Sequence, residues 1–181
     1  MAQEKLKELL QKMMSGDTRA LARTMTLVER ESDALGDILR TIAKKQGHAF
    51  SVGVTGPPGA GKSSLVDGLI TLMRDSGKTV GVIAIDPSSP FTGGALLGDR
   101  IRMTKHYLDK GVFIRSMATR GSHGGLARAT KDVIKLMDAG GLDYIIVETV
   151  GVGQTELDVM GMTDSVLVAL VPEAGDGVQV M

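Results

Sequence analysis

The feature that most constrains the fold of this chain is a glycine-rich octapeptide at residues 56–63. It reads Gly-Pro-Pro-Gly-Ala-Gly-Lys-Ser and fits the pattern G-x-x-x-x-G-K-[ST]. An apolar run at residues 50–55 precedes it, and an amphipathic stretch at residues 63–74 follows it. A loop of this kind between a strand and a helix binds anions at the start of the helix. The sequence therefore predicts a strand–loop–helix unit that binds phosphate groups.

The backbone of this loop predicts which groups would contact an anion. Gly59 and Gly61 allow a tight turn and a close approach to phosphate, while Pro57 and Pro58 have no N–H to donate. The donors must therefore come from residues 59–63 and the first helical turn, where the helix dipole also favours negative charge.

Two side chains complete the predicted phosphate site. Lys62 supplies a mobile cation for the β- and γ-phosphates, and the Ser63 hydroxyl is positioned to bind Mg²⁺. A glycine-rich turn without a ligand is the alternative, and the flanking strand and helix argue against it. The residues expected to bind nucleotide are Gly56, Pro57, Pro58, Gly59, Ala60, Gly61, Lys62, Ser63, Ser64 and Gly151.

Apolar runs alternate with amphipathic stretches along most of the chain. The runs predict strands at residues 50–55, 79–85, 112–117, 144–147 and 165–171. The stretches between them predict helices at residues 63–74, 99–108, 126–137 and 156–160. This alternation predicts an α/β P-loop fold with a mostly parallel sheet and helices on both faces. Ligands of such sheets bind outside the carboxyl ends of the strands.

The first 47 residues differ from the rest and predict a helical arm. Leu21, Met25 and Val28 share one helical face, and Gly16-Asp17 and Ser32-Asp33 are typical helix starts. Residues 35, 38, 39 and 42 form a second apolar face. No chemical motif lies in this segment. We therefore expect a helical arm at residues 1–47, packed on the domain or on a partner, and a P-loop domain at residues 48–181.

Composition excludes several classes of function. The chain has no cysteine, so a disulfide, a thiolate metal site and a cysteine nucleophile are all ruled out. Its formal net charge is zero and no basic stripe is present, so no nucleic-acid partner is expected. No run of about 18 apolar residues could span a membrane, and the first residues lack a signal-peptide core. We expect a cytoplasmic protein, or one of the mitochondrial matrix if its source is a eukaryote.

Acidic residues follow two of the predicted strands. Asp86 ends the second strand, where its carboxylate could contact Mg²⁺ directly or through water, or could belong to an Asp-Pro turn. Glu148 ends the fourth, where P-loop NTPases usually carry an Asp that orients Mg²⁺. The alternative for Glu148 is an acceptor for nearby backbone donors. Gly151 could give its N–H to a γ-phosphate.

Other polar residues leave their roles open. On spacing alone Asp99 reads as a helix N-cap. Gln154 could orient an attacking water, although it lies three residues past Gly151. Three arginines could each neutralise transition-state charge, and no spacing chooses among them: Arg115, Arg120 and Arg128. The three histidines show no metal-ligand spacing: His48, His106 and His123.

Several of these segments together resemble one protein family. They are residues 56–64, 86–90, 98–103, 115–121, 148–154 and 171–176. They closely resemble the MeaB/ArgK family of GTPases, which are chaperones of adenosylcobalamin-dependent methylmalonyl-CoA mutase. The resemblance covers the whole chain, most strongly from Gly16. The segments around Asp86, Asp99 and Glu148 are far more specific than the phosphate loop.

The resemblance implies a G domain that binds GTP or GDP with Mg²⁺ and hydrolyses GTP. It implies a catalytic set of Lys62, Asp99 and Glu148, and a metal set of Ser63, Asp86, Asp99 and Glu148. It implies switch regions at residues 87–103 and 148–154, and the start of a third at residues 173–181. It also implies that the partner is methylmalonyl-CoA mutase or a similar mutase, whose cofactor loading the protein gates, and that the whole protein is a homodimer.

One departure from the family pattern is large. Family members carry an Asn-Lys-x-Asp motif that reads guanine, and this chain contains no asparagine. We therefore expect an N-terminal fragment, in which guanine specificity is inherited by analogy. The alternatives are a P-loop kinase or ATPase linked to amino-acid transport, a nucleotide-binding module made inactive by truncation, and a nickel or zinc insertion GTPase. The absence of cysteine and of clustered histidine argues against the last of these.

Overall fold

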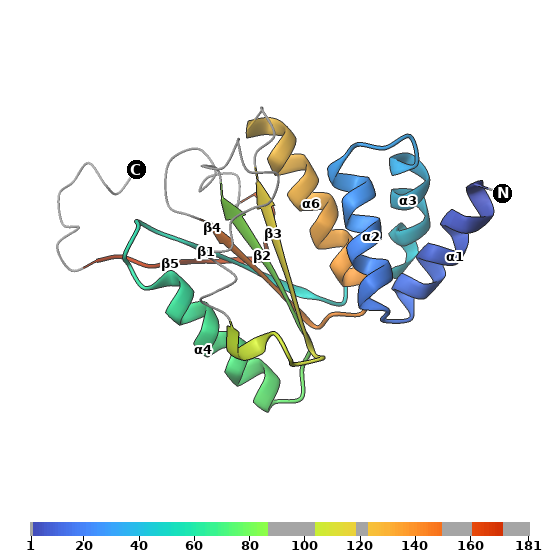
Figure 1. The fold of residues 1–181 in the computed structure, drawn as a ribbon. Helices are drawn as coiled ribbons and strands as arrows, with labels where there is room; N and C mark the ends of the chain where they lie inside the picture. Colours follow the sequence, from blue (N-terminus) through green and yellow to red (C-terminus); the bar gives the residue numbers. More distant parts are fainter. Residues whose placement is uncertain (1, 87–103, 119–122, 150–160, 172–181) are drawn as a thin grey trace.

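Five apolar segments pair as the strands of one parallel sheet, with the order β3-β2-β4-β1-β5 (Figure 1). The computed structural model describes residues 2–86, 104–118, 123–149 and 161–171. The strands are β1 (Phe50–Thr55), β2 (Val80–Asp86), β3 (Val112–Ala118), β4 (Tyr144–Thr149) and β5 (Ser165–Val168). The helices are α1 (Ala2–Met14), α2 (Thr18–Glu29), α3 (Leu35–Ile42), η1 (Ala43–Lys45), α4 (Lys62–Asp75), η2 (Thr104–His106) and α6 (His123–Ala139).

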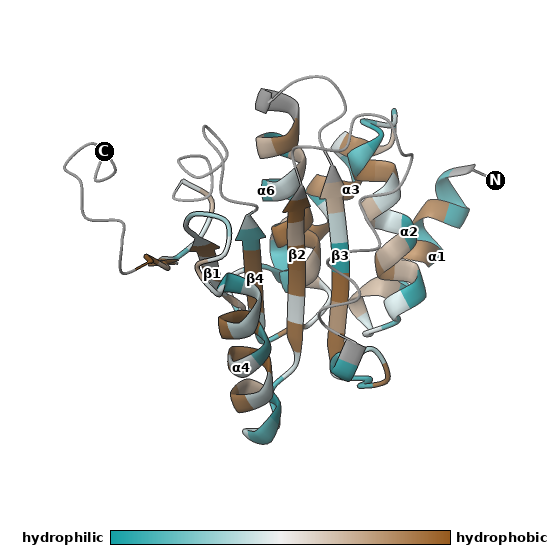
Figure 2. Ribbon diagram, turned by 60° about the vertical axis from the view of Figure 1, so that its left-hand side comes forward, coloured by the Kyte–Doolittle hydropathy of each residue, from teal (hydrophilic) through white to brown (hydrophobic). Residues whose placement is uncertain are grey.

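Helices cover the sheet on both faces, which confirms the predicted α/β fold (Figure 1). Helix α4 packs on one face, and α6 packs on the other with α2 and α3 behind it. Strand alternation divides the core accordingly, because Ile146 lies in the cluster with α4 whereas Ile145 and Val147 lie in the cluster with α6. Figure 2 shows the strands as mostly hydrophobic, as expected for a sheet buried on both faces.

The N-terminal helices share the core on the α6 side. Leu21, Met25 and Val28 of α2 are buried there, as their spacing predicted. Asp17 caps α2 by accepting a hydrogen bond from the Ala20 N–H, which confirms that start signal. The second start signal is wrong, since α3 begins at Leu35 without a side-chain cap. The division of the chain at residue 47 stays a prediction.

An acidic side chain fixes the segment that joins these helices to the sheet. The Asp138 carboxylate of α6 accepts hydrogen bonds from three consecutive backbone N–H groups, those of Gly47, His48 and Ala49. Because Phe50 starts β1 directly afterwards, this contact sets where the first strand enters the sheet.

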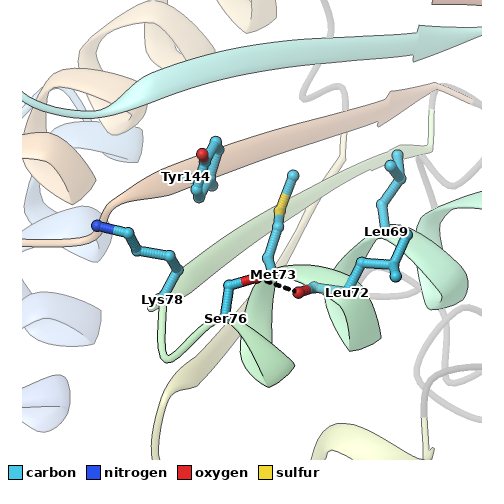
Figure 3. Close-up of a pocket in the computed structure, with 6 residues that line it drawn as sticks. All are labelled: Leu69, Leu72, Met73, Ser76, Lys78 and Tyr144. Atoms are coloured by element: carbon cyan, nitrogen blue, oxygen red, sulfur yellow. Dashed lines mark hydrogen bonds between the residues drawn. The ribbon is translucent and has the colours of Figure 1, made fainter.

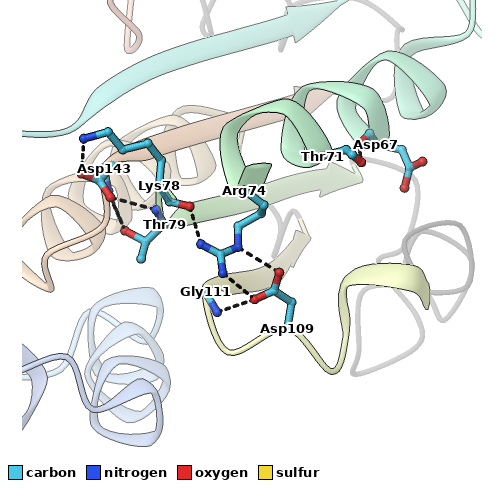
Figure 4. Close-up of polar contacts among 8 residues, drawn as sticks. All are labelled: Asp67, Thr71, Arg74, Lys78, Thr79, Asp109, Gly111 and Asp143. Carbon is cyan, nitrogen blue, oxygen red and sulfur yellow. Dashed lines mark hydrogen bonds and ion pairs between the residues drawn. The ribbon is translucent and has the colours of Figure 1, made fainter. Parts of the chain in front are cut away.

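Two element ends differ from the prediction. The helix expected at residues 99–108 does not continue past His106 in the described residues. The Asp109 carboxylate instead accepts from the Gly111 N–H and pairs with Arg74 of α4, which turns the chain into β3 (Figure 4). The strand expected to reach residue 171 ends at Val168, which pairs with Thr55, the last residue of β1.

Polar contacts also hold the amino ends of the strands together. The Asp143 carboxylate accepts from the N–H and the hydroxyl of Thr79, and these hydrogen bonds lower the pKa of Asp143 (Figure 4). Asp164 makes the same pair of contacts with Ser51. No described helix is long and apolar enough to cross a lipid bilayer.

Candidate functional site

The glycine-rich loop adopts a backbone that its glycines make possible. Gly56, Gly59 and Gly61 have φ angles of 136°, 81° and 83°, in a backbone region that residues other than glycine rarely adopt. Gly56 is also confined from outside the loop, since a Cβ at this position would clash with the Ala169 carbonyl oxygen. Residues 56–61 thus fold into a tight turn between β1 and α4.

The start of helix α4 presents backbone donors at this turn. Gly61 is its N-cap residue and provides no side-chain cap. Among the described residues, no protein group accepts from the N–H groups of Lys62, Ser63 or Ser64. Open N–H groups at a helix start, together with the helix dipole, form an anion-binding site.

The Lys62 side chain lies over the loop and is only 7% exposed. Its ammonium donates to the carbonyl oxygens of Gly56 at 2.6 Å and Pro57 at 2.9 Å. An ammonium carries three hydrogens, so one donor remains for an oxygen of a bound anion. The loop therefore brings a positive charge and the open N–H groups to one place.

A hydroxyl–carboxylate pair lies at the first turn of α4. The Ser63 hydroxyl donates to Oε1 of Glu148 across 2.7 Å. Glu148 is 6% exposed and lies near the carboxyl end of β4, level with Val54 of β1 and Ala84 of β2. The sheet therefore brings Glu148 to the phosphate loop, as its position at a strand end predicted.

This pair suits a hard divalent cation. Mg²⁺ binds oxygen ligands and usually takes one or two carboxylates, with phosphate and water completing its six positions. No group of three or more His, Cys, Asp or Glu side chains that could hold a metal occurs in the described residues. Among the described residues, Ser63 and Glu148 thus fit a Mg²⁺ whose other positions are taken by phosphate oxygens and water.

Comparison with known proteins identifies the family. The family model described as "Methylmalonyl Co-A mutase-associated GTPase MeaB" matches residues 21–181. The chain belongs to the MeaB family. This confirms the resemblance noted from the sequence.

Relatives in this family share much of their sequence with the chain. A Pyrococcus abyssi protein named "Putative GTPase" is 60% identical over 172 residues, which are 95% of the chain and 53% of the relative. Escherichia coli "GTPase ArgK" is 39% identical, covering 96% of the chain and 54% of that protein. The mouse "Methylmalonic aciduria type A homolog, mitochondrial" is 36% identical, covering 92% and 44%. The chain thus spans about half the length of these relatives.

A solved structure supports the same assignment. The crystal structure of a protein titled "LAO/AO transport system kinase" is similar to the chain with a TM-score of 0.73 and 32% sequence identity. The similarity covers 92% of the chain and 50% of that protein.

Other predicted site residues of this MeaB-family chain are only partly described. Asp86 is the last residue of β2, two residues after Ala84, which pairs with Glu148. Its backbone therefore lies at the carboxyl ends of the strands, close to Glu148. Nothing is described of its side chain. Asp99 and Gly151 lie outside the described residues, as do Gln154 and Arg120. The roles predicted for these residues remain predictions.

Two predicted candidates lie in other surroundings. Arg115 forms a bidentate ion pair with Glu29 of α2, with N–O distances of 2.8 and 2.7 Å. Its guanidinium is therefore paired on the α6 side of the sheet. Arg128 is exposed on α6. His106 contacts Asp67 of α4 at 3.0 Å, and its ring forms part of no metal cluster in the described residues.

Two open hollows in the described structure lie away from the phosphate loop. One, of about 300 Å³, is lined by Leu69, Leu72 and Met73 of α4 and by Tyr144, at the amino end of β4 (Figure 3). The other, of about 650 Å³, lies between α2 and the residues that lead into β3.

Sequence reasoning missed one pair of residues beside the site. The Thr149 hydroxyl donates to the Thr55 hydroxyl at 3.1 Å, between the last residues of β4 and β1. Both side chains are buried, at 1% and 5% exposure. A polar residue at the end of each of two apolar strands was the available signal.

Proposed function

We propose that the protein binds GTP with Mg²⁺ and hydrolyses it, as a regulatory GTPase. The observation that carries the proposal is the 2.7 Å contact of Ser63 with Glu148, at a helix start whose first N–H groups meet no acceptor among the described residues. Lys62 adds a cation at the same place. Membership of a family described as a GTPase supports the choice of reaction.

The residues of the phosphate loop and of the strand ends have distinct roles in this proposal. The N–H groups of Lys62, Ser63 and Ser64 bind phosphate oxygens, and the Lys62 ammonium binds the β- and γ-phosphates. The Ser63 hydroxyl and the Glu148 carboxylate hold Mg²⁺, with Asp86 and Asp99 as further proposed ligands. When bound there, Mg²⁺ would supply positive charge to offset the charge that develops on the transferred phosphoryl group. Gly151 is proposed to donate its N–H to the γ-phosphate.

The proposed biological role concerns a mutase. The family description names methylmalonyl-CoA mutase, and a mouse relative is named for methylmalonic aciduria. We infer that the protein protects an adenosylcobalamin-dependent acyl-CoA mutase of this type and gates its cofactor loading. Homodimer formation is part of this proposal.

Phosphate release tests the reaction. The purified protein is incubated with GTP and varied Mg²⁺, and inorganic phosphate is measured with and without a methylmalonyl-CoA mutase. We expect Mg²⁺-dependent release of phosphate that changes when the mutase is added. No release above the rate of a Lys62→Ala control would contradict the assignment as a GTPase.

A kinase is the second candidate, because a protein similar in structure is titled a transport system kinase. A kinase transfers the γ-phosphoryl group to an acceptor other than water. With γ-labelled nucleotide, hydrolysis gives labelled inorganic phosphate, whereas a kinase gives a labelled acceptor in equal amount to the diphosphate. The same assay therefore separates the two functions.

A further inference from the structure

The end of β4 contacts the phosphate-binding unit from both faces of the sheet. Successive side chains of a strand point to opposite faces, so Glu148 and Thr149 point in opposite directions. Glu148 faces α4, where it accepts from Ser63. Thr149 faces the α6 side, where it donates to Thr55, the residue that directly precedes the loop.

Thr55 is also bound by the strand on its other side. Its carbonyl oxygen accepts from the Ala169 N–H at 2.8 Å, just after β5 ends. Its hydroxyl accepts from Thr149. Thr55, the last residue before the phosphate loop, is therefore hydrogen-bonded to residues at the ends of both neighbouring strands, β4 and β5.

The Thr149–Thr55 contact is not needed to complete the sheet. The backbone pairing of β1 with β4 extends to Val54 and Glu148, one residue before this contact, and neighbouring side chains on the same face, such as Val147, are apolar. Replacing both partners of a buried hydrogen bond by apolar groups of the same shape can be nearly neutral for stability. A hydroxyl pair at this point is therefore better explained by the alignment of the two strand ends than by stability.

We propose that Thr149 is a positioning residue for the phosphate and Mg²⁺ site. Its hydrogen bond to Thr55 fixes the end of β4 against the end of β1. This holds the Glu148 carboxylate, one residue earlier, at the correct distance from Ser63 on the helix that β1 and the loop lead into. The inference rests on the proposed function, since it assigns Thr149 an effect on Mg²⁺ that is exerted through Glu148.

The test measures Mg²⁺ binding apart from turnover. Mg²⁺ is titrated calorimetrically into the protein with a non-hydrolysable GTP analogue, for the parent and for Thr149→Val, Thr149→Ser and Thr24→Val. Thr24 is the matched control, because it is a buried threonine whose hydroxyl donates within α2, far from the loop in sequence. We expect Thr149→Val to weaken Mg²⁺ binding roughly three- to tenfold, as for loss of one hydrogen bond. Thr149→Ser, which keeps the hydroxyl, and Thr24→Val should bind as the parent does.

A double-mutant cycle identifies the route of the effect. If Thr149 acts through Glu148, Thr149→Val should have little further effect once Glu148→Gln is present, so the two changes are not additive. Full additivity, or equal Mg²⁺ binding by Thr149→Val and Thr24→Val, would overturn the inference while the parent still binds Mg²⁺ and nucleotide. A parent that binds neither would overturn the proposed function itself and this inference with it. Thermal unfolding of each variant identifies any that fails to fold, in which case the Thr55→Val variant replaces Thr149→Val in the same cycle.

Discussion

The Ser63 hydroxyl donates a 2.7 Å hydrogen bond to Oε1 of Glu148 and thereby joins the start of helix α4 to the end of strand β4. The two residues lie 85 positions apart in the chain. Their contact brings a hydroxyl and a carboxylate to the phosphate loop, where a hard cation would find oxygen ligands. An amide substitution of Glu148 keeps its shape and removes its charge, so it tests this relationship directly.

Glu148→Gln is expected to raise the Mg²⁺ concentration that gives half-maximal GTP hydrolysis by about tenfold, because a hydrogen bond or metal contact of a charged group is lost. Mg²⁺ titrations of the hydrolysis rate measure the change. Asp132→Asn is the control, since Asp132 is an equally buried carboxylate that pairs with Lys135 on α6. Lower thermal stability of Glu148→Gln with an unchanged Mg²⁺ requirement would instead make Glu148 a structural acceptor. Asp86→Asn belongs in the same series.

Lys62→Ala is expected to weaken triphosphate binding roughly a hundredfold and to abolish hydrolysis, because the loop loses its side-chain cation. Calorimetry measures the affinity, and circular dichroism checks that the fold is kept. Lys78→Ala is the control, because Lys78 pairs with Asp143 at the opposite end of the sheet. Unchanged affinity in a folded Lys62→Ala protein would refute the phosphate site.

The 181 residues contain no asparagine and therefore no Asn-Lys-x-Asp motif to read guanine. A site built on buried hydrogen bonds to a ligand rejects a mismatched one by orders of magnitude, and this chain lacks that element. We expect the 181-residue chain to bind GTP and ATP weakly, with affinities that differ by less than about tenfold. Competition binding with both nucleotides measures the difference. A strong preference for GTP would mean that other residues of this chain read the base.

Arg115→Ala is expected to lower the free energy of unfolding by about 1–3 kcal/mol, because it leaves the partly buried Glu29 carboxylate without its guanidinium partner. Chemical denaturation measures the loss. The rate of hydrolysis should stay within about twofold of the parent, since the pair lies between β3 and α2. Arg128→Ala, an exposed change on α6, should alter stability by less than about 0.5 kcal/mol. A large loss of turnover in Arg115→Ala alone would instead make Arg115 a catalytic arginine.

Stability should fall in acid partly through Asp164. Hydrogen bonds from the Ser51 hydroxyl and the Ser51 N–H lower the pKa of Asp164 in the folded state. The unfolded state, whose aspartate pKa is about 3.9, then binds more protons, so this contribution is complete above that pH and is lost as the pH falls through the lower folded pKa. Asp164→Asn should flatten the pH dependence of the free energy of unfolding below about pH 4. Urea denaturation across this range measures it, with the exposed Asp33→Asn as a control that should follow the parent.

Much of this protein followed from the sequence alone. The phosphate loop is contiguous, and its glycines and the helix start at Lys62 set its geometry locally. The strands were predictable because segments buried on both faces are almost continuously apolar. Helix α2 followed from its period and from the Asp17 cap. The ends of helices and strands were harder to predict, as at His106 and Val168, because they depend on hydrogen bonds and ion pairs with neighbouring elements.

Only the tertiary structure decided which distant residues meet. Ser63 reaches Glu148, Thr149 reaches Thr55 and Arg115 reaches Glu29 across 85, 94 and 86 positions. Position at a strand end predicted that Glu148 would lie near the loop, but it could not tell which hydroxyl would contact it or that Arg115 points to α2. The physical reason is that such contacts depend on strand order, on which face each side chain occupies, and on how the helices pack on that face. None of these is encoded in a local stretch of residues, because sheet pairing and layer packing join segments that lie far apart in the chain.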